Sequence, residues 1–387
     1  MARLPTQKKR QPSQNPPSAA LTWPAETELV GLVIELAPYS NDYLYAEYTI
    51  GLHAWFLAQV QQTNPELSRS LHDEQSEKAF TISGLEGELL AVGKDLQLQA
   101  DKTYSWYINI LSQPVAQWAS KWLQNLPAVV DIRNAPLRII SCQVALPSTT
   151  YKQLLTTLLS RTSTIQLTFL TPTSFRSKQH HFPLPVPKNL FHSYLRRWND
   201  FSEIKIPQDQ FLNWIEETVI IHRHKLESAK VIAGKKGSVT GFTGAIELGL
   251  SKKVNENSDF GQYFYALAQL APYCGTGHKT TFGLGQTRIG WLLSDILPVS
   301  PRQNLLASRI AELTEAFMAK RRRTGGTRAQ EIAETWATIL ARREIGESLS
   351  AIAIDLEMPY ETVKTYVKLA RRSLKANGEV EEVAMTF

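Results

Sequence analysis

The sequence predicts an α+β protein with two tandem ferredoxin-like (RRM-like) domains, followed by an all-α domain that contains a helix-turn-helix. The chain has 387 residues, and because domains usually run to about 100 to 200 residues, two or three are expected. Two long stretches repeat the order strand, helix, strands, helix, strand, and after Pro298 only helical patterns remain. We therefore expect ferredoxin-like domains at 22–155 and 156–298 and a helical domain at 302–378.

The composition favours a polyanionic partner and a cytoplasmic protein. Lys and Arg exceed Asp and Glu by 42 to 36, a net charge of +6, although charge alone does not identify the partner. Cys142 and Cys274 stand in no metal-ligand or redox spacing, which suits structural roles in a reducing compartment. No apolar run approaches the roughly 20 residues that cross a bilayer, and the amino terminus lacks a signal-peptide core, so we expect no membrane association.

The first domain is expected to follow a disordered basic tail at 1–21, where Lys8, Lys9 and Arg10 stand among repeated Pro, Gln and Ser. An apolar strand near 29–36 precedes a helix in which Leu52, Phe56 and Val60 recur at helical spacing. The elements expected next are strands near 80–83, 88–92 and 104–110, a helix at 115–124 and a strand at 137–146.

The second and third domains are read in the same way. An alternating strand at 164–169 leads through Pro-rich residues 183–187 into a helix at 189–199. There follow strand-like runs at 219–224, 229–233 and 242–250, a helix at 263–270 and a closing strand at 286–291. The third domain is expected to hold helices at 304–322 and 327–343 and two shorter ones ending near Leu374.

A glycine-rich loop lies between the predicted helix at 263–270 and the closing strand. Glycines allow positive φ and close backbone approach, and exposed N–H groups beside a lysine and threonines can hold phosphate oxygens. The expected RNA contacts are Gly275, Gly277, His278, Lys279, Thr280, Thr281, Gly283 and Gly285. The alternative is a flexible connection with no ligand.

Other nucleotide-binding loops fit this segment poorly. A P-loop needs Gly before Lys, but His278 precedes Lys279, and no dinucleotide fingerprint follows a strand, so ATP and dinucleotides are disfavoured. A basic turn at Lys235, Lys236 and Gly237 is a second candidate contact with the same nucleic acid.

These motifs resemble the carboxy-terminal half of the CRISPR-associated repeat-processing endoribonucleases of the RAMP superfamily. The resemblance is carried by Gly241-x-x-Gly244, by the loop from Gly275 to Gly285, and by the segments 167–175, 183–185 and 190–199, and it covers roughly residues 28 to 292. It implies two ferredoxin-like domains and metal-independent cleavage of CRISPR precursor RNA by attack of a 2′-hydroxyl, which leaves 2′,3′-cyclic phosphate and 5′-hydroxyl ends. The implied partners are CRISPR repeat RNA, its crRNA product and other CRISPR effector proteins.

The resemblance also points to catalytic residues. An Asn64-Pro65-x-Leu67 helix start leads to His72, with Lys78 six residues later. His72 would transfer protons, as a pKa of about 6.5 allows, and Lys78 would stabilise the transition-state phosphate. The alternatives are a surface histidine and a solvated lysine.

The third catalytic role is left open. Leu57 stands where some members carry a tyrosine, and His53, Tyr43 and Tyr45 are candidate substitutes. A non-catalytic repeat-RNA-binding subunit is therefore the alternative function. No cofactor is expected. No metal is expected either, because no Cys or carboxylate completes a ligand set with the remaining histidines, which we interpret as RNA-facing or structural: His180, His181, His192, His222 and His224.

The end of the chain looks like the helix-turn-helix of sigma-factor and response-regulator families. A short amphipathic helix within 346–356 precedes a second helix from Tyr360, whose inward face is expected to hold Val363, Val367, Ala370 and Leu374. Its outer face carries the candidate nucleic-acid contacts Lys364, Thr365, Lys368, Arg371 and Arg372. Duplex DNA or RNA are the candidate partners. The alternatives are a DNA-binding regulator, a unit that docks a partner protein and a merely structural unit. Arg321 to Gly326 would form a flexible basic linker.

Overall fold

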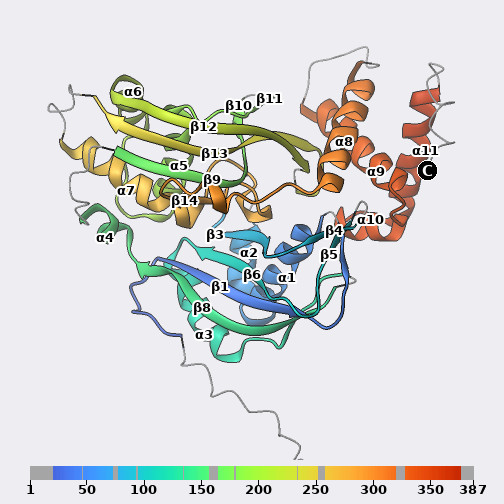
Figure 1. Ribbon diagram of the computed structural model, residues 1–387, viewed down its shortest axis with the longest axis horizontal. Helices are drawn as coiled ribbons and strands as arrows, with labels where there is room; N and C mark the ends of the chain where they lie inside the picture. Colours follow the sequence, from blue (N-terminus) through green and yellow to red (C-terminus); the bar gives the residue numbers. More distant parts are fainter. Residues whose placement is uncertain are drawn as a thin grey trace, which may run out of the picture.

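A computed structural model describes residues 21–45, 47–72, 77–92, 95–133, 135–156, 164–177, 180–232, 234–251, 258–319 and 327–375. The predicted amino-terminal tail, apart from Leu21, and the whole of the predicted basic linker lie outside these ranges. Figure 1 shows two sheets one above the other, the earlier part of the chain below and the later part above, with the last four helices at one side.

The lower sheet has five antiparallel strands in the order β3-β6-β1-β8-β7. The strands are β1 (Leu29–Pro38), β3 (Phe80–Glu86), β6 (Tyr104–Ile110), β7 (Val129–Val130) and β8 (Leu137–Thr149). The helices of this half are α1 (Tyr48–Thr63), α2 (Pro65–His72), α3 (Gln113–Trp122) and α4 (Tyr151–Thr156). A small second sheet joins β2 (Tyr43–Leu44), β5 (Asp95–Gln97) and β4 (Leu90–Val92).

Every second residue of β6 is buried, as expected for a strand with one face covered and the other open. The buried residues contribute to the core of the lower half. Trp106 and Ile108 of this strand share one hydrophobic cluster with Phe56 of α1 and Trp118 of α3. Burial on one face of the sheet therefore fixes where α1 and α3 lie.

The upper sheet has four antiparallel strands in the order β12-β13-β9-β14. The strands are β9 (Thr164–Thr173), β12 (Val219–Ile232), β13 (Ser238–Leu250) and β14 (Thr287–Ile289), and a hairpin pairs β10 (Phe175–Ser177) with β11 (His180–Phe182). The helices α5 (Pro187–Phe201), α6 (Gln208–Thr218) and α7 (Ser258–Cys274) contribute to its core. In both sheets the four main strands follow the order second, third, first, fourth, which confirms the predicted ferredoxin-like arrangement.

Two details of the upper half differ from the prediction. The runs at 219–224 and 229–233 are one strand, because β12 stays paired with β13 from Val219 to Ile232 with a single register shift after Ile221. The helix α6 was not predicted, although Phe211 and Ile215 are spaced one turn apart and are fully buried.

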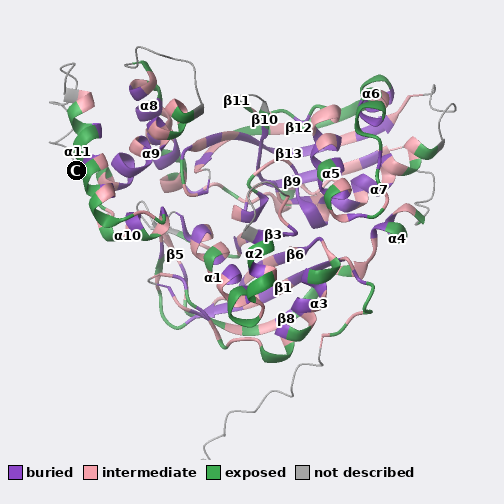
Figure 2. Ribbon diagram, turned by 180° about the vertical axis from the view of Figure 1, so that it is seen from behind, coloured by how far each residue is buried: buried purple, intermediate pink, exposed green. Residues whose placement is uncertain are grey.

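The helical unit consists of α8 (Pro301–Ala319), α9 (Thr327–Glu344), α10 (Leu349–Asp355) and α11 (Tyr360–Lys375). α8 packs against β12 and α9. As predicted, Val363, Val367 and Ala370 are buried, and Leu374 packs against the same core. Figure 2 shows the buried residues along the strands and the exposed ones on the outer sides of α2, α6 and α11. Among the described helices, none is both long and apolar enough to cross a bilayer.

Candidate RNA-binding and catalytic site

A pocket of about 220 Å³ opens between the two halves of the molecule. It combines Lys78, the predicted catalytic lysine two residues before β3, with part of the glycine-rich loop. We call it the basic pocket; its lining residues are Glu77, Lys78, Phe175, Arg176, Asn189, His192, Ser193, Arg196, Arg197, Gly277, His278, Lys279, Thr280 and Thr281. The fold thus brings together two groups of predicted site residues that are far apart in the chain.

The glycine loop, residues 275–285, has a fixed backbone. Thr276 N–H donates to the Gly285 carbonyl (2.8 Å), and Gly285 N–H donates to the Pro172 carbonyl (3.1 Å). A Cβ atom at Gly277 would lie 2.2 Å from the Ser174 carbonyl oxygen, and one at Gly285 would lie 2.0 Å from the Thr276 carbonyl oxygen. Both glycines also have positive φ, at 79° and 68°. Close backbone contact, together with this conformation, therefore requires glycine at these two positions.

Arg197 of α5 forms hydrogen bonds with the glycine loop. Its side chain is buried, and its Nη2 donates to the Gly277 carbonyl (2.9 Å) and to Thr280 Oγ1 (3.3 Å). Its Nε lies 3.5 Å from a carboxylate oxygen of Glu77, and its Nη1 donates to Ser193 Oγ (2.8 Å). One guanidinium therefore ties α5, the glycine loop and the residue before Lys78 together.

The loop threonines point inward. Thr280 and Thr281 are 7% and 8% exposed. Thr276 is fully buried, and its hydroxyl is hydrogen-bonded to the hydroxyls of Tyr194 (2.7 Å) and Thr287 (2.7 Å). The assignment of Thr280 and Thr281 as RNA contacts therefore rests on their backbone and stays a prediction. Lys279, in contrast, is exposed at the rim, in the left-handed conformation with φ 62°.

Positive charge dominates the basic pocket. Five lining residues are Lys or Arg, whereas Glu77 is its single carboxylate among the described residues and already pairs with Arg196 and Arg197. Lys279 is exposed as a whole residue, but its ammonium lies beside other protein atoms, 5.6 Å from the centre of the Phe282 ring. Desolvation of the ammonium, followed by the nearby charge of Arg176, lowers the pKa of Lys279. Crowded cations of this kind favour an anion, which would relieve their mutual repulsion.

Two histidines of the pocket are biased toward the neutral form. Desolvation lowers the pKa of His278 to about 4. Its Nδ1–H donates to the Ser174 carbonyl (2.8 Å), and its ring stacks on His181 with centroids 5.1 Å apart. Burial, and then the charge of Arg196, lowers the pKa of His192. His278 therefore stays uncharged near pH 7 and packs within the site, where it adds no phosphate-binding charge.

His72 is the last residue of α2, and its side chain lies outside the described part of the structure. The predicted helix start is confirmed, since Asn64 Oδ1 accepts from Leu67 N–H (3.0 Å). Glu77 in the pocket wall follows His72 by five positions, so the chain keeps their Cα atoms within about 18 Å. The catalytic role of His72 stays a prediction.

The candidates for the third role lie elsewhere. His53 Nδ1–H donates to the Thr281 carbonyl (2.9 Å) and its ring stacks on Phe282 (4.4 Å), so it fixes the loop to α1. Tyr45 lies under Arg133 (4.0 Å), and burial raises its pKa. Tyr43 is 47% exposed on β2. None of these three lines the basic pocket as described.

Several other predicted contacts lie away from the pocket. Lys235 Nζ lies 2.7 Å from Glu357, and Gly237 N–H donates to Thr338 Oγ1 (3.0 Å), so this basic turn packs on the helical unit. The histidines at 222 and 224 are exposed on β12. Within the described ranges, no three His, Cys, Asp or Glu side chains gather as a metal site would require.

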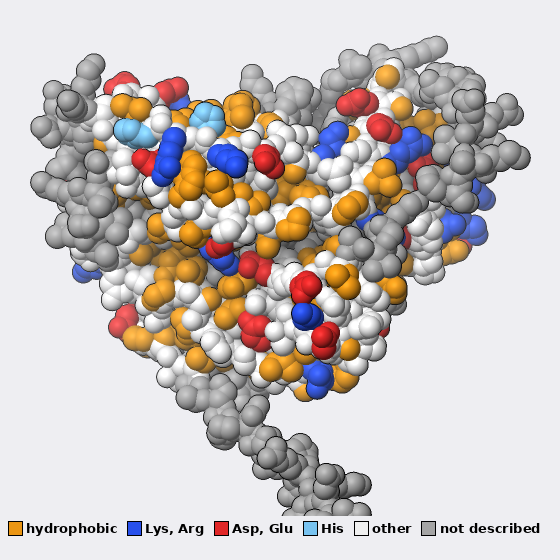
Figure 3. All heavy atoms as spheres, in the orientation of Figure 1, with side chains coloured by type: hydrophobic (Ala, Val, Ile, Leu, Met, Phe, Trp, Pro, Cys, Tyr) orange, Lys and Arg blue, Asp and Glu red, His pale blue; other side chains and the backbone are white. Residues whose placement is uncertain are grey.

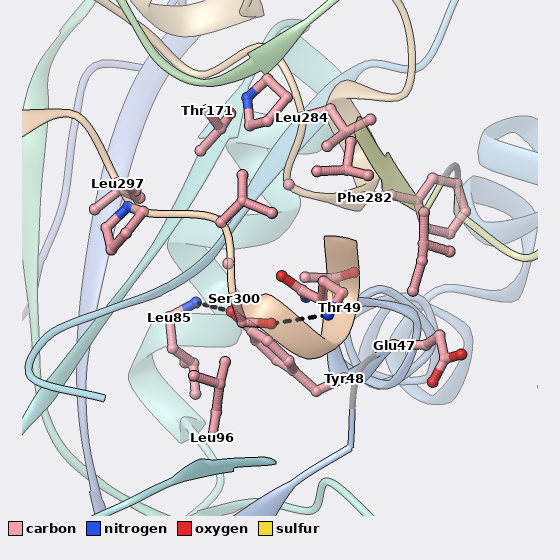
Figure 4. Close-up of a pocket in the computed structure, with 18 of the residues that line it drawn as sticks. Glu47, Tyr48, Thr49, Leu85, Leu96, Thr171, Phe282, Leu284, Leu297 and Ser300 are labelled. Carbon is pink, nitrogen blue, oxygen red and sulfur yellow. Dashed lines mark hydrogen bonds between the residues drawn. The ribbon is translucent and has the colours of Figure 1, made fainter. Parts of the chain in front are cut away.

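A second cavity, of about 250 Å³, lies on the other side of the glycine loop. Figure 4 shows Leu85, Leu96, Leu284 and Leu297 around it, with the Tyr48 hydroxyl accepting from Leu85 N–H (3.1 Å). Its lining is mostly apolar and lacks the cations of the basic pocket, so it is the poorer candidate for binding RNA.

Sequence reasoning missed Arg176 and Arg197. Arg176 lies on a short hairpin strand with no pattern of its own. Arg197 did leave a signal, because it falls on the buried side of α5 with Leu190 and Tyr194, where an unpaired arginine would be costly. A charged residue on an apolar helix face should have indicated a buried partner.

Comparison with known proteins identifies the family. The family model described as the CRISPR Cas6 N-terminal domain matches residues 30–150, and the one described as CRISPR-associated endoribonuclease Cas6 matches residues 167–287. Together they cover more than half of the chain. The chain belongs to the Cas6 family of CRISPR-associated endoribonucleases. The helical unit lies beyond both Cas6 matches.

Individual Cas6 proteins are distant relatives. The Cas6 endoribonuclease of Mycobacterium tuberculosis (strain CDC 1551 / Oshkosh) is 25% identical over 142 residues, which are 37% of this chain and 41% of that protein. The match thus spans about two fifths of the curated relative. A solved Cas6 product complex has a TM-score of 0.57 at 23% identity, and Thermus thermophilus Cas6 has 0.51 at 24%; each match covers 68% of this chain and 100% or 99% of the other. These likenesses support the fold.

Proposed function

We propose that this chain is a metal-independent endoribonuclease that binds CRISPR repeat RNA and cuts precursor crRNA in the basic pocket. The single observation that carries the proposal is the convergence of Lys78 and the glycine loop on one cationic pocket. Family membership supplies the substrate class. The charge of the pocket fits the phosphodiester backbone of that substrate.

The proposed reaction is an internal transfer. The 2′-oxygen attacks the adjacent phosphorus, the new O2′–P bond forms, and the P–O5′ bond breaks, which leaves a 2′,3′-cyclic phosphate and a 5′-hydroxyl. His72 moves protons at these oxygens, work typically worth about 10² to 10⁴ in rate. Lys78 stabilises the negative charge that grows on the phosphate. The glycine loop and Lys279 position the strand.

The test is cleavage of end-labelled repeat RNA in EDTA, followed by analysis of the product ends. We expect cyclic-phosphate products from the wild type, a loss of about 10²-fold or more in single-turnover rate for His72→Ala, and a loss of about 10²-fold for Lys78→Ala. Lys121→Ala removes an exposed lysine on α3 and should match the wild type. A His72→Ala protein that cuts at the wild-type rate would refute the role of His72.

A non-catalytic RNA-binding subunit is the second candidate. It is favoured by Leu57 at the expected tyrosine position and by the absence of Tyr43 and Tyr45 from the lining of the pocket in the described residues. It predicts tight binding of repeat RNA without any cyclic-phosphate product. Lys279→Ala should weaken RNA binding under either function, since Lys279 lies at the rim as a binding residue.

A further inference from the structure

The helix α11 exposes a basic face that the cleavage reaction does not use. Its residues, spaced along one side of the helix, are all exposed: Lys364, Thr365, Lys368, Arg371 and Arg372. The opposite side is buried against the rest of the helical unit through Val363, Val367 and Ala370. One side of α11 therefore packs in the core, and the other side is accessible to a binding partner.

Among the residues that the structure describes, few carboxylates compensate the charge on this face. Lys364 Nζ lies 3.4 Å from Glu361 in a solvent-exposed pair, which contributes little. From the described part of the chain, no carboxylate comes within ion-pair distance of Lys368, Arg371 or Arg372. Such a surface gains most from a polyanion, because each phosphate it neutralises releases a condensed counterion.

The supports of α11 are rigid. A compact cluster joins Ile339 of α9, Ile352 and Leu356 at α10, and Val363 of α11. Ser348 Oγ accepts from Ala351 N–H (3.1 Å) and caps α10, and the turn into α11 passes through Glu357 at φ 52°. Two helices joined by a tight turn over a third are the scaffold that presents a helix to a groove.

We propose that α11 binds duplex DNA by entering the major groove with its basic face. The 16 residues of α11 span about 24 Å at the helical rise. A B-form major groove is about 12 Å wide and admits a helix. The A-form major groove of duplex RNA is too deep and narrow for side chains to read, so the helix geometry favours DNA. Lys364 and Thr365, nearer the start of the helix, would meet base edges, and Lys368, Arg371 and Arg372 would meet phosphates.

This DNA-binding surface is separate from the basic pocket. Figure 1 places α11 at the right-hand edge of the molecule, whereas α5, which supplies Arg196 and Arg197 to the pocket, lies in the opposite half. Figure 3 shows Lys and Arg side chains on this right-hand edge, over the helical unit. The inference therefore goes beyond the proposed cleavage function, and its test does not depend on RNA cleavage.

The test measures binding of the full chain to duplex DNA. Fluorescence anisotropy with a 30-base-pair random-sequence duplex, about the span of three helical turns, would compare the wild type with an Arg371→Glu/Arg372→Glu variant. A Lys121→Glu/Lys152→Glu variant is the matched control, because it makes the same change in net charge on exposed helix positions elsewhere. Selection from a random duplex library would show sequence preference, and thermal melting would confirm that each variant folds.

We expect the α11 variant to bind DNA at least about tenfold more weakly and its salt dependence to fall by about 1.8 in log–log slope, the value for two lost phosphate contacts. The control should stay within about twofold, a difference well under 1 kcal/mol. The wild type should enrich a short motif. Equal weakening in both variants, or no enriched motif, would overturn the proposal. A loss for repeat RNA as large as that for DNA would assign the face to RNA instead.

Discussion

Arg197 shows how one buried residue organises the candidate site. Its guanidinium contacts Gly277, Thr280, Ser193 and Glu77, so every partner belongs to the wall of the basic pocket. Buried charge of this kind is stable only with its partners in place. We therefore assign Arg197 a positioning role: it does not present charge to RNA but fixes the loop that does.

Comparing substitutions at Arg197 and Arg196 distinguishes the positioning role of a buried arginine from the effect of an exposed charge. Arg197→Met should lower the free energy of unfolding by about 2–4 kcal/mol, because the Gly277 carbonyl and Glu77 lose their buried donor. Arg196→Met, next to it on α5 but 57% exposed at its side chain, should cost at most about 1 kcal/mol. Urea denaturation of both proteins tests this. Equal losses would show that Arg197 does not hold the loop.

Among single residues, the sequence predicted those that belong to a recognisable local motif. Lys78 and the glycines of the loop stand in recognisable spacing, and the structure joins them in one pocket. Arg176 carries no such spacing, and Arg197 shows only that a charge falls on an apolar helix face, because the partners of both lie in distant segments of the chain. A single sequence does not show such contacts.

The glycine loop combines buried side chains with one residue at the surface. Its inward threonines and neutral His278 shape the loop, while Lys279 remains at the surface. His53 joins it to α1 through the Thr281 carbonyl. These contacts link the two halves, so we expect a rigid bridge here, with the flexible connection remaining the alternative.

Adding one methyl group at Gly285 tests whether the glycine loop is rigid. Gly285→Ala would place Cβ 2.0 Å from the Thr276 carbonyl oxygen at φ 68°. The left-handed conformation alone costs about 1–2 kcal/mol, so we expect a loss of stability of at least about 2 kcal/mol, together with weaker RNA binding.

Gly261→Ala is the matched control for that change. This glycine lies in α7 with nothing within 4 Å of the added carbon. Alanine is the better helix former, so the protein should gain about 0.5–1 kcal/mol. Thermal melting of both variants reports the difference. A Gly285→Ala protein as stable as Gly261→Ala would mean that the loop adjusts freely.

Elements with strong local periodicity were predicted well. The strand near 29–36 and the helix at 189–199 appear as β1 and α5 with slightly wider bounds. The gap placed between 224 and 229 was wrong, because pairing along β13 keeps β12 continuous where its exposed, polar residues give no apolar pattern. Sheet pairing supplies hydrogen bonds that local sequence does not indicate.

At the scale of the whole molecule, the helical unit is fastened to the lower half by buried charge. Arg342 of α9 is fully buried; its Nε lies 3.2 Å from Glu47, and its Nη2 lies 2.6 Å from both Glu347 and Asp355. Arg133 of the lower half reaches Asp355 at 3.0 Å. A unit outside both family matches is thus joined to the Cas6 portion by three carboxylates and two guanidiniums, which fixes α11 relative to the basic pocket.

This network makes stability depend on pH in a defined direction. Desolvation outweighs the opposing effect of Arg342 and raises the pKa of Glu47 to about 7, from an ordinary value of 4.5. Between these values the folded protein binds a proton that the unfolded chain releases, so Glu47 makes stability fall as pH rises through the window. Above about pH 7 this contribution should level off.

Glu47→Gln should remove that part of the pH dependence. The amide imitates the protonated carboxyl, so between pH 5 and 7, a range inside the titration window, the melting temperature of the variant should fall less than that of the wild type. Glu331→Gln, an exposed change on α9, should keep the wild-type slope. The test is the melting temperature of the wild type and of both variants, measured across this pH range. If Glu47→Gln and Glu331→Gln show the same slope as the wild type, Glu47 is ionised throughout, and the buried network keeps all of its charges when the helical unit docks.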